Sequence, residues 1–336
     1  MGTWELNRGL PAAAASAVLL GMTPILGKLA ILGGLPPLTV VALRTAGATS
    51  LLFLVLILFR RQSFYIYPVG LLACFLAGLI NGTGSIFYYT GLARIDASLA
   101  QLLYSLYPIF VAVLLYLDGY RYTPMTILRI GLSIPAVLLL TSPTASSSDL
   151  IGSLMLIAAG LLYALHIPIN QRVLYDAPAP TVTFYTLVAM TLVVIPPAFI
   201  FRSATASWGE AALWPVAGLT LVTFLSRLSL FTGVKYLGGL DTALIGLGEI
   251  VVTLALAFLL LDESLTAAQW IGALLLISAI ILLPFDQRER GKLPIGGWLR
   301  WLLPHARYTR QPETESTSPL KGEEVDERPR TSPVQD

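Results

Sequence analysis

The stretch GLGEIVVTLALAFLLLDESL, residues 246–265, indicates which solvent this chain is built for. Its apolar part holds one acidic residue, Glu249, followed by a run without charge until Asp262. A charged side chain near the centre of a bilayer costs roughly 2.5–3.5 kcal/mol, so it normally faces a cavity or a partner rather than lipid. The stretch therefore predicts a membrane-spanning helix that carries a functional carboxylate, with Gly246 and Gly248 leaving space for a ligand beside it.

The composition of the whole chain also indicates an integral membrane protein. Apolar residues make up 56% of the 336 residues and charged residues only 12%, whereas a soluble domain is usually about a quarter charged. The mean hydropathy is +0.76. The formal net charge of +2 gives no indication of nucleic-acid binding, and the single cysteine, Cys74, excludes an internal disulfide. We expect the lipid bilayer as a partner and no nucleic acid.

Apolar runs of about twenty residues, each long enough to span a bilayer, recur ten times along the chain. Short connections between them predict antiparallel neighbours in an all-α fold. The N-terminus lacks a clean signal cleavage site and is taken as the first span. The distribution of Lys and Arg predicts that both termini lie on the cytoplasmic side of the cell membrane. The runs cover residues 11–32, 37–59, 68–90, 97–117, 124–141, 150–170, 181–201, 212–236, 239–261 and 267–284.

The chain resembles itself at an offset of 142 residues. LLGMTPILGK from Leu19 aligns with LLYALHIPIN from Leu161, and TGLAR from Thr90 aligns with TGVKY from Thr232. Each half holds five runs, an odd number, so the second half must start on the opposite side of the membrane. We predict two inverted five-helix repeats, residues 1–145 and 146–285, the architecture of many secondary transporters. The alternative is an old duplication kept only for packing.

The last part of the chain, residues 286–336, differs in composition and is predicted to be a cytoplasmic tail. GGWLRWLLPHAR, residues 296–307, interleaves Trp and Leu with Arg, which favours a short helix on the membrane surface. A merely adhesive segment is the alternative. The charged sequence that follows, rich in Pro and Ser, predicts disorder.

Three stretches of the chain carry a resemblance to a known family. They are PPLTVVALRTAG from Pro36, TGLARIDASLAQLLYSLYPIFVAVLL from Thr90, and the sequence from Thr232 to Leu283 around Glu249. Over residues 11–285 the chain resembles the EamA-type members of the drug/metabolite transporter superfamily. The resemblance implies a ten-helix carrier built from two five-helix repeats. The chain departs from the family at Ile250, because members of the family usually have a proline directly after the glutamate that corresponds to Glu249.

Five charged residues fall inside the predicted spans, and they differ in depth. Glu249 and Arg227 lie near the middle of their runs, so they are the first candidates for a binding site; a structural pair between the two is the alternative. Lys28 lies in the outer half of its run, and the resemblance suggests an ion-pair or cavity role for Arg44. Arg129 lies near the end of its run, where snorkelling to the interface explains it.

Polar and aromatic residues in the predicted spans extend the candidate site. Gln101, Tyr104 and Tyr107 fall on the fourth run, and Tyr163, His166 and Asn170 share one face of the sixth at helical spacing. We expect them to line a cavity between the halves, although His166 would also fit a purely structural role. Tyrosines near span ends are often interface anchors, which is the interpretation for Tyr88 and Tyr89.

The function predicted from these features is transport rather than catalysis. The chain lacks a nucleotide-binding loop, a metalloprotease motif and a nucleophile elbow, so we expect no catalytic residue, metal or cofactor. We predict a secondary active transporter of a small polar or amphipathic metabolite that works by alternating access, with Glu249 binding a coupling proton. The fifth and tenth runs, poor in polar residues, are packing faces or the faces of a homodimer. The alternative is a membrane scaffold or lipid-handling protein.

Overall fold

The computed structural model describes residues 3–94, 97–140, 149–201, 210–261, 267–282, 285 and 297–302, and within these ranges it is entirely helical. Every apolar run of the sequence is occupied by one helix or by two consecutive helices. The helices are α1 (Thr3–Leu32), α2 (Pro37–Phe59), η1 (Arg61–Phe64), α3 (Pro68–Arg94), α4 (Ala97–Tyr104), α5 (Tyr107–Leu117), α6 (Pro124–Leu140), α7 (Leu150–Leu174), α8 (Ala179–Ile200), α9 (Glu210–Leu237), α10 (Gly239–Gly246), α11 (Gly248–Leu261), α12 (Ala267–Ile281) and η3 (Arg300–Leu302).

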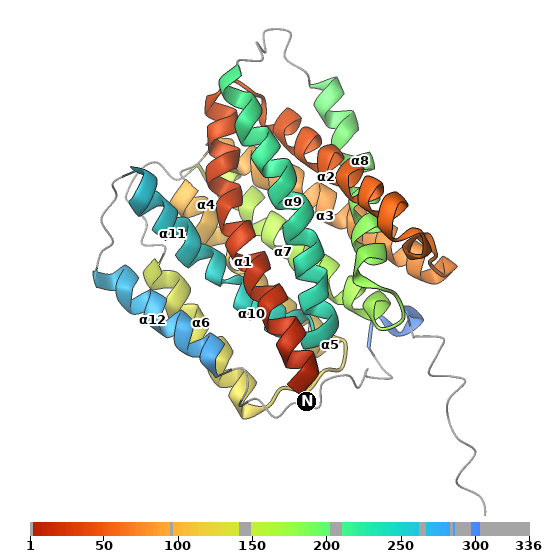
Figure 1. The fold of residues 1–336 in the computed structure, drawn as a ribbon. Coiled ribbons are helices and arrows are strands. Elements are labelled where there is room, and N and C mark those ends of the chain that lie inside the picture. Colours follow the sequence, from red (N-terminus) through yellow and green to blue (C-terminus); the bar gives the residue numbers. More distant parts are fainter. Residues whose placement is uncertain are drawn as a thin grey trace, which may run out of the picture. The chain divides into compact units, whose positions relative to one another are not determined.

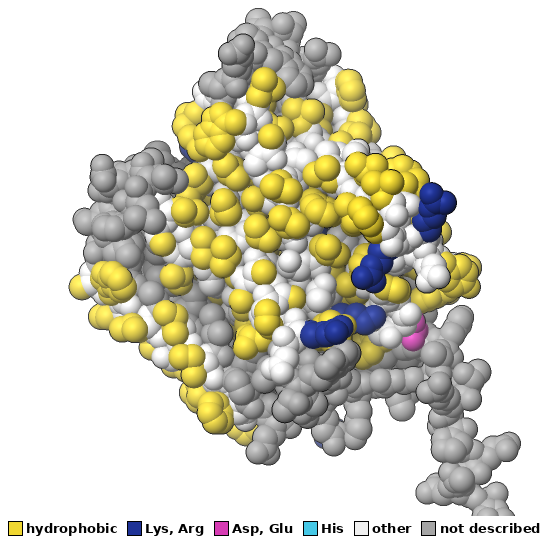
Figure 2. All heavy atoms as spheres, in the orientation of Figure 1, with side chains coloured by type: hydrophobic (Ala, Val, Ile, Leu, Met, Phe, Trp, Pro, Cys, Tyr) yellow, Lys and Arg dark blue, Asp and Glu magenta, His cyan; other side chains and the backbone are white. Residues whose placement is uncertain are grey.

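Six of these helices, α1, α2, α3, α7, α8 and α9, are long and apolar enough to cross a bilayer. Large apolar side chains such as Phe59, Leu72 and Leu154 are exposed on the outside of the helices. In Figure 2 apolar side chains are spread over the whole described surface in view, whereas the basic side chains lie mostly toward its lower right. A water-soluble protein rarely exposes so continuous an apolar surface. The chain is therefore a multi-pass membrane protein.

The fourth and ninth apolar runs are interrupted, although the sequence predicts one continuous helix for each. α4 ends at Tyr104 and α5 begins at Tyr107, followed by Pro108, which has no N–H to donate and disfavours helical geometry in the residue before it. α10 ends at Gly246 and α11 begins at Gly248, and glycine is a weak helix former. The second interruption places Glu249 in the first turn of α11, where the helix dipole favours a negative charge.

The main helix contacts are related to one another by the 142-residue offset. α1 packs on α9 and α3 packs on α7, α2 packs on α8, and α6 packs on α12; Figure 1 shows α1 beside α9 and α6 beside α12. Replacing each helix by its counterpart in the other half turns each of these pairs into a pair of the same set. Thr49 and Thr191, which are 142 residues apart, meet at 2.8 Å between their hydroxyl oxygens.

Glycines allow close helix contacts that follow the same offset. A Cβ at Gly47 would lie 2.7 Å from the Thr220 side chain, and a Cβ at Gly78 would lie 2.6 Å from the Ala189 Cβ. Residues 47 and 78 plus 142 are 189 and 220, so the two contacts are counterparts. Small residues let membrane helices approach closely, because little attraction other than packing holds them together.

Two buried ion pairs connect helices that are far apart in the sequence. Arg129 of α6 contacts Asp241 of α10 at 2.5 Å and donates a second hydrogen bond to the Ala279 carbonyl. Arg172 of α7 contacts Asp118, just after α5, at 2.6 Å. The snorkelling predicted for Arg129 is wrong, because its side chain is fully buried. Its partner lies 112 residues away in the sequence and could not be foreseen from local depth.

Part of the tail is described and packs on the helices. Leu299 and Leu302 belong to the buried core, whereas Trp298 and Trp301 are exposed. Instead of the predicted surface helix, the segment forms a turn that begins at Gly297 and ends in η3. Residues 296 and 303–307 of that predicted helix, and the charged sequence after it that was predicted to be disordered, lie outside the described residues.

Candidate functional site

A pocket lies between the two halves of the chain, with about 520 Å³ of space between atoms, part of it open to the surroundings. Its walls come from α1, α2, α3 and α4 of the first half and from α7, α9 and α11 of the second. The lining residues are Leu20, Thr23, Pro24, Arg44, Asn81, Gly84, Ser85, Tyr88, Tyr89, Gln101, Tyr104, Ala159, Tyr163, Arg227 and Glu249. Six of the ten residues predicted for the site are among them.

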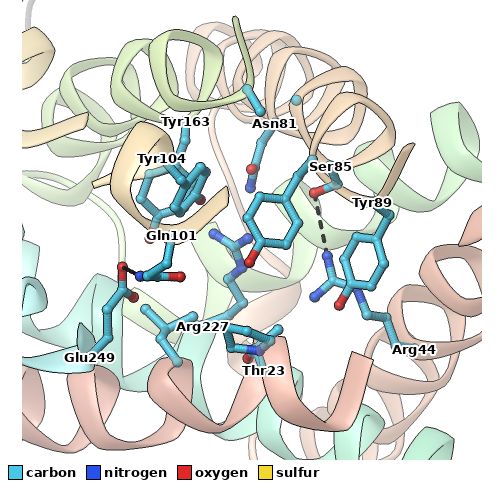
Figure 3. A pocket seen from close by; sticks show the side chains of 15 residues that line it. Thr23, Arg44, Asn81, Ser85, Tyr89, Gln101, Tyr104, Tyr163, Arg227 and Glu249 are labelled. Carbon is cyan, nitrogen blue, oxygen red and sulfur yellow. Dashed lines mark hydrogen bonds between the residues drawn. The ribbon is translucent and has the colours of Figure 1, made fainter. Parts of the chain in front are cut away.

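Arg44 occupies one side of the pocket (Figure 3). Its guanidinium donates to the hydroxyls of Ser85, at 3.4 Å, and Thr223, at 3.3 Å. The guanidinium carbon also lies 4.8 Å from the ring centroid of Tyr89, within the range of a cation–π contact. Neutral groups therefore hold this buried arginine, and its positive charge is available to the pocket.

Glu249 lies on the opposite side of the pocket (Figure 3). Its carboxylate is buried, with the residue only 4% exposed, and accepts a hydrogen bond from the Gln101 amide at 3.2 Å. The two flanking glycines do not open space for a ligand. Gly246 accommodates the Tyr107 hydroxyl, and Gly248 packs beside Ala17.

Arg227 reaches from α9 into the region between Glu249 and Arg44 (Figure 3). Its guanidinium carbon lies 5.4 Å from the ring centroid of Tyr163. Among the described residues it forms no ion pair with Glu249 within the 4.0 Å limit that defines the other pairs. The structural pair considered as an alternative is thus not made in this conformation.

The pocket is rich in buried hydrogen-bond donors that remain unused. Within the described part of the chain, five lining residues carry a buried polar atom that has no hydrogen-bond partner. A buried polar group without a partner costs roughly 1–3 kcal/mol, so such groups normally have a ligand or water to bind. No three His, Cys, Asp or Glu side chains among the described residues come together to hold a metal. The five buried polar atoms of the lining that have no hydrogen-bond partner are Arg44 Nε, Asn81 Nδ2, Tyr89 Oη, Tyr163 Oη and Arg227 Nη1.

Four predicted site residues lie outside the lining. Tyr107 is buried beneath it, with its ring centroid 4.9 Å from that of Tyr163, and donates to the Ala243 carbonyl. His166 is fully buried and its Nδ1 contacts the Tyr163 carbonyl.

The other two residues outside the lining are Lys28 and Asn170. Lys28 reaches the Leu92 carbonyl at 3.5 Å, and Asn170 accepts a hydrogen bond from Thr186. Both lie at equivalent positions of the two halves, yet neither side chain reaches the pocket.

Sequence reasoning missed several residues of α3 that line the pocket. Tyr88 and Tyr89, interpreted as interface anchors, are 8% and 1% exposed and face the pocket. Asn81 and Ser85 line it as well. The spacing of Asn81, Ser85 and Tyr88 at i, i+4 and i+7 places them on one helix face, a signal that could have found this wall.

Comparison with known proteins shows what the chain is similar to. It is 26% identical over 196 residues, 58% of this chain and 70% of the relative, to an "uncharacterized transporter" of Archaeoglobus fulgidus. A solved structure titled "Crystal structure of protein" superposes with a TM-score of 0.69 at 15% identity, covering 84% of this chain and 99% of the other. At that identity the second likeness supports the fold alone.

The sequence pattern of one family matches nearly all of the helical part of the chain. It matches twice, over residues 7–142 and again over residues 150–285. Each match covers one of the two halves that face each other across the pocket. The chain therefore belongs to the EamA-like transporter family.

Proposed function

We propose that the protein is a secondary active transporter of a small polar or amphipathic metabolite, and that the pocket between its halves is the substrate site. The single observation that carries the proposal is the set of unused donors around the pocket. Arg44 and Arg227 present positive charge without a carboxylate partner within 4.0 Å among the described residues, and Tyr89 and Tyr163 present free hydroxyls. A substrate with acceptor oxygen atoms would satisfy these groups, which makes binding favourable.

Glu249 is the proposed site of a coupling proton. A carboxylate that lies in a pocket and has only an amide as its hydrogen-bond partner can exchange a proton without breaking an ion pair. Its protonation would then follow the side of the membrane to which the pocket is open. Movement of each charge across the membrane potential is worth about 2.3 kcal/mol per 100 mV, enough to drive accumulation.

The proposed mechanism is alternating access between two inverted halves, with ten spans and both termini on the cytoplasmic side of the cell membrane. Two features support inversion. The first residues of α1 lie beside the C-terminal end of α9, since a Cβ at Gly9 would lie 2.7 Å from Leu237. The counterpart of α1 is α7, and its last residues lie on the same side of the molecule, because Gln171 near the end of α7 accepts a hydrogen bond from Gly239, just after α9. Equivalent helices thus run in opposite directions. Interrupted helices beside a central pocket are typical of such carriers.

The test uses purified full-length protein. Small polar metabolites are first screened for an increase in melting temperature, because a ligand that binds the folded state stabilises it. The strongest stabiliser is then measured for counterflow in proteoliposomes, with and without a pH gradient. Saturable flux that is lost in Arg44→Met or Arg227→Met is the expected result. Stabilisation by lipids alone, with no flux of any stabilising compound, would instead favour the scaffold or lipid-handling alternative.

A further inference from the structure

One end of the molecule is held together by buried polar contacts between the halves. It is the end at which α5 and α7 end and α10 begins, named here the Asp118 end. Asp118 is fully buried, and its Oδ2 accepts from Arg172 Nε at 3.1 Å and Nη2 at 2.6 Å. Asp118 belongs to the first half and Arg172 to the second. A buried ion pair adds little net stability, so its position calls for another explanation.

The neighbouring residue of α7 repeats the connection. The Gln171 amide donates to the Tyr120 hydroxyl at 3.1 Å and accepts from the Gly239 backbone N–H at 2.7 Å. Gln171 therefore joins the turn after α5 to the start of α10. Separating α5 from α7 would break the Gln171–Tyr120 hydrogen bond together with the Asp118–Arg172 pair.

The tail completes this network. The Leu299 backbone N–H donates to the second carboxylate oxygen of Asp118 at 3.0 Å, and the Trp298 indole N–H donates to the Leu114 carbonyl at 3.2 Å. Leu299 is fully buried and Leu302 is 3% exposed. The tail segment 297–302 thus uses the acceptor of Asp118 that Arg172 leaves free.

Gly297 is required for this docking. Its φ is +97°, a conformation that favours glycine, and a Cβ there would lie 2.4 Å from the Asp118 carbonyl oxygen and 2.5 Å from its side chain. A larger residue at position 297 would therefore displace the segment and leave the helices unchanged in sequence.

We infer that Asp118, Arg172 and the tail segment 297–302 form a latch that holds the Asp118 end closed until its release lets this end open in the transport cycle. The inference rests on the proposed function, because alternating access requires this end to open. The latch residues do not line the pocket, so they act by positioning α5 against α7. Release of the tail segment would remove one hydrogen bond from Asp118 and two buried leucines from the core, and would shift the population toward the open end.

The test measures how fast a buried cysteine becomes accessible. In a Cys74→Ala background, Val173→Cys reports on the Asp118 end, since Val173 is fully buried in the last turn of α7. Ala48→Cys, fully buried in a separate core between α2 and α8, reports on general loosening. The reagent is a polar maleimide on full-length protein in proteoliposomes permeabilised to the reagent. Gly297→Val should raise the labelling rate at position 173 about tenfold, as expected when a hydrogen bond to a charged group is lost, without changing position 48.

Three further variants sharpen the result. Arg300→Ala is the matched control, because Arg300 belongs to the same segment but is exposed. Asp118→Asn keeps the acceptor for Leu299 and weakens the bond to Arg172, so it should also raise labelling at position 173. Trp298→Phe, which removes only the indole donor, should give a smaller rise. If Gly297→Val aggregates, the labelling rates of Asp118→Asn and Trp298→Phe test the latch instead.

Unchanged labelling at position 173 in these variants, or equal rises at positions 173 and 48, would overturn the latch. The readout needs no substrate, so it is independent of the transport assay. A rise confined to position 173 without any flux supports a latch and contradicts the proposed transport. Flux without a labelling response supports transport and contradicts the latch.

Discussion

Asp241 and Glu249 are two buried carboxylates eight residues apart, on either side of the α10–α11 interruption, and they have opposite surroundings. Asp241 is 2% exposed and contacts the buried guanidinium of Arg129 at 2.5 Å. Glu249 is 4% exposed, lines a pocket, and has an uncharged amide as its hydrogen-bond partner. A carboxylate whose charge is already matched holds helices together, whereas one without a cationic partner remains available for a substrate or a proton.

The comparison predicts its largest effect at the Arg129 pair. Arg129→Met would remove the buried guanidinium that contacts the Asp241 carboxylate, which we expect to cost roughly 3–5 kcal/mol. The measurement is the melting temperature of the purified protein, together with its yield. The double variant Arg129→Met with Asp241→Asn should recover most of the loss, because it also removes the buried negative charge that Arg129 balances. Equal losses in the single and double variants would show that the pair is not coupled.

A smaller effect is expected at the glycine that separates the two carboxylates. Gly246→Ala places a Cβ 2.3 Å from the Tyr107 hydroxyl, which is bound to the Ala243 carbonyl. We expect a loss of about 1–3 kcal/mol, the usual range for overpacking. Gly248→Ala is the control, because its Cβ would lie 3.6 Å from Ala17, an ordinary contact. Equal melting temperatures for both variants would refute the close packing at Gly246.

The test of Glu249 itself separates stability from transport. Glu249→Gln keeps an oxygen for the Gln101 amide, so stability should change by less than about 1 kcal/mol, the value of a typical hydrogen bond. Flux under a pH gradient should fall at least about tenfold, which corresponds to about 1.4 kcal/mol. Melting temperature and proteoliposome flux are measured on the same preparation. A variant with normal flux and normal pH dependence would refute a proton-coupling role for Glu249.

The pairing alternative for Glu249 and Arg227 is tested by a double-variant cycle. Because no ion pair within 4.0 Å joins them in the described structure, the coupling energy between Arg227→Met and Glu249→Gln should be smaller than that of the buried Arg129–Asp241 pair. The same cycle on Arg129 and Asp241 serves as the positive control. Coupling as large as that of the control would restore the structural pair.

The smallest effect belongs to an exposed carboxylate that provides a reference outside the membrane. Asp149 precedes α7, and hydrogen bonds from Arg94 and from the backbone N–H groups of Gly152 and Ile151 hold its pKa below the ordinary 3.8. A lowered pKa stabilises the protein at neutral pH, and this contribution is lost as the pH falls through that lowered pKa. Asp149→Asn should therefore lower the melting temperature slightly at pH 7 and have no effect once Asp149 is protonated. An equal effect at both pH values would contradict this.

Much of the helical framework could be predicted from the sequence. Apart from the first run, whose helix begins eight residues earlier at Thr3, the runs coincide with helices to within a few residues, because a bilayer sets the length of an apolar helix and the termini are marked by Pro, Gly and charge. The two interruptions were missed, although Pro108 and the Gly246–Gly248 pair mark them. Hydropathy averaged over a run of twenty residues does not distinguish one continuous helix from two short ones.

The site could be predicted only in part, and the residues show why. Glu249, Arg227 and Arg44 were found because charge in a membrane is costly wherever it lies. Tyr88 and Tyr89 were misinterpreted, since tyrosine is common both at interfaces and in pockets. Lys28, Tyr107, His166 and Asn170 were expected at the pocket, but helix rotation directs each of them to a backbone carbonyl or a neighbouring hydroxyl instead.

The sequence by itself determined that this chain is a helical membrane protein with two similar halves and charged residues in its interior. Hydropathy and the 142-residue offset are properties of the linear chain, and they follow from what a bilayer excludes. Only the tertiary structure decided which charges are matched. Arg129 and Asp241 are 112 residues apart and Asp118 and Arg172 are 54 apart. Whether a carboxylate meets a cation or an open pocket depends on how distant helices pack, because an ion pair needs its two groups within a few ångströms in space, whatever their separation in sequence.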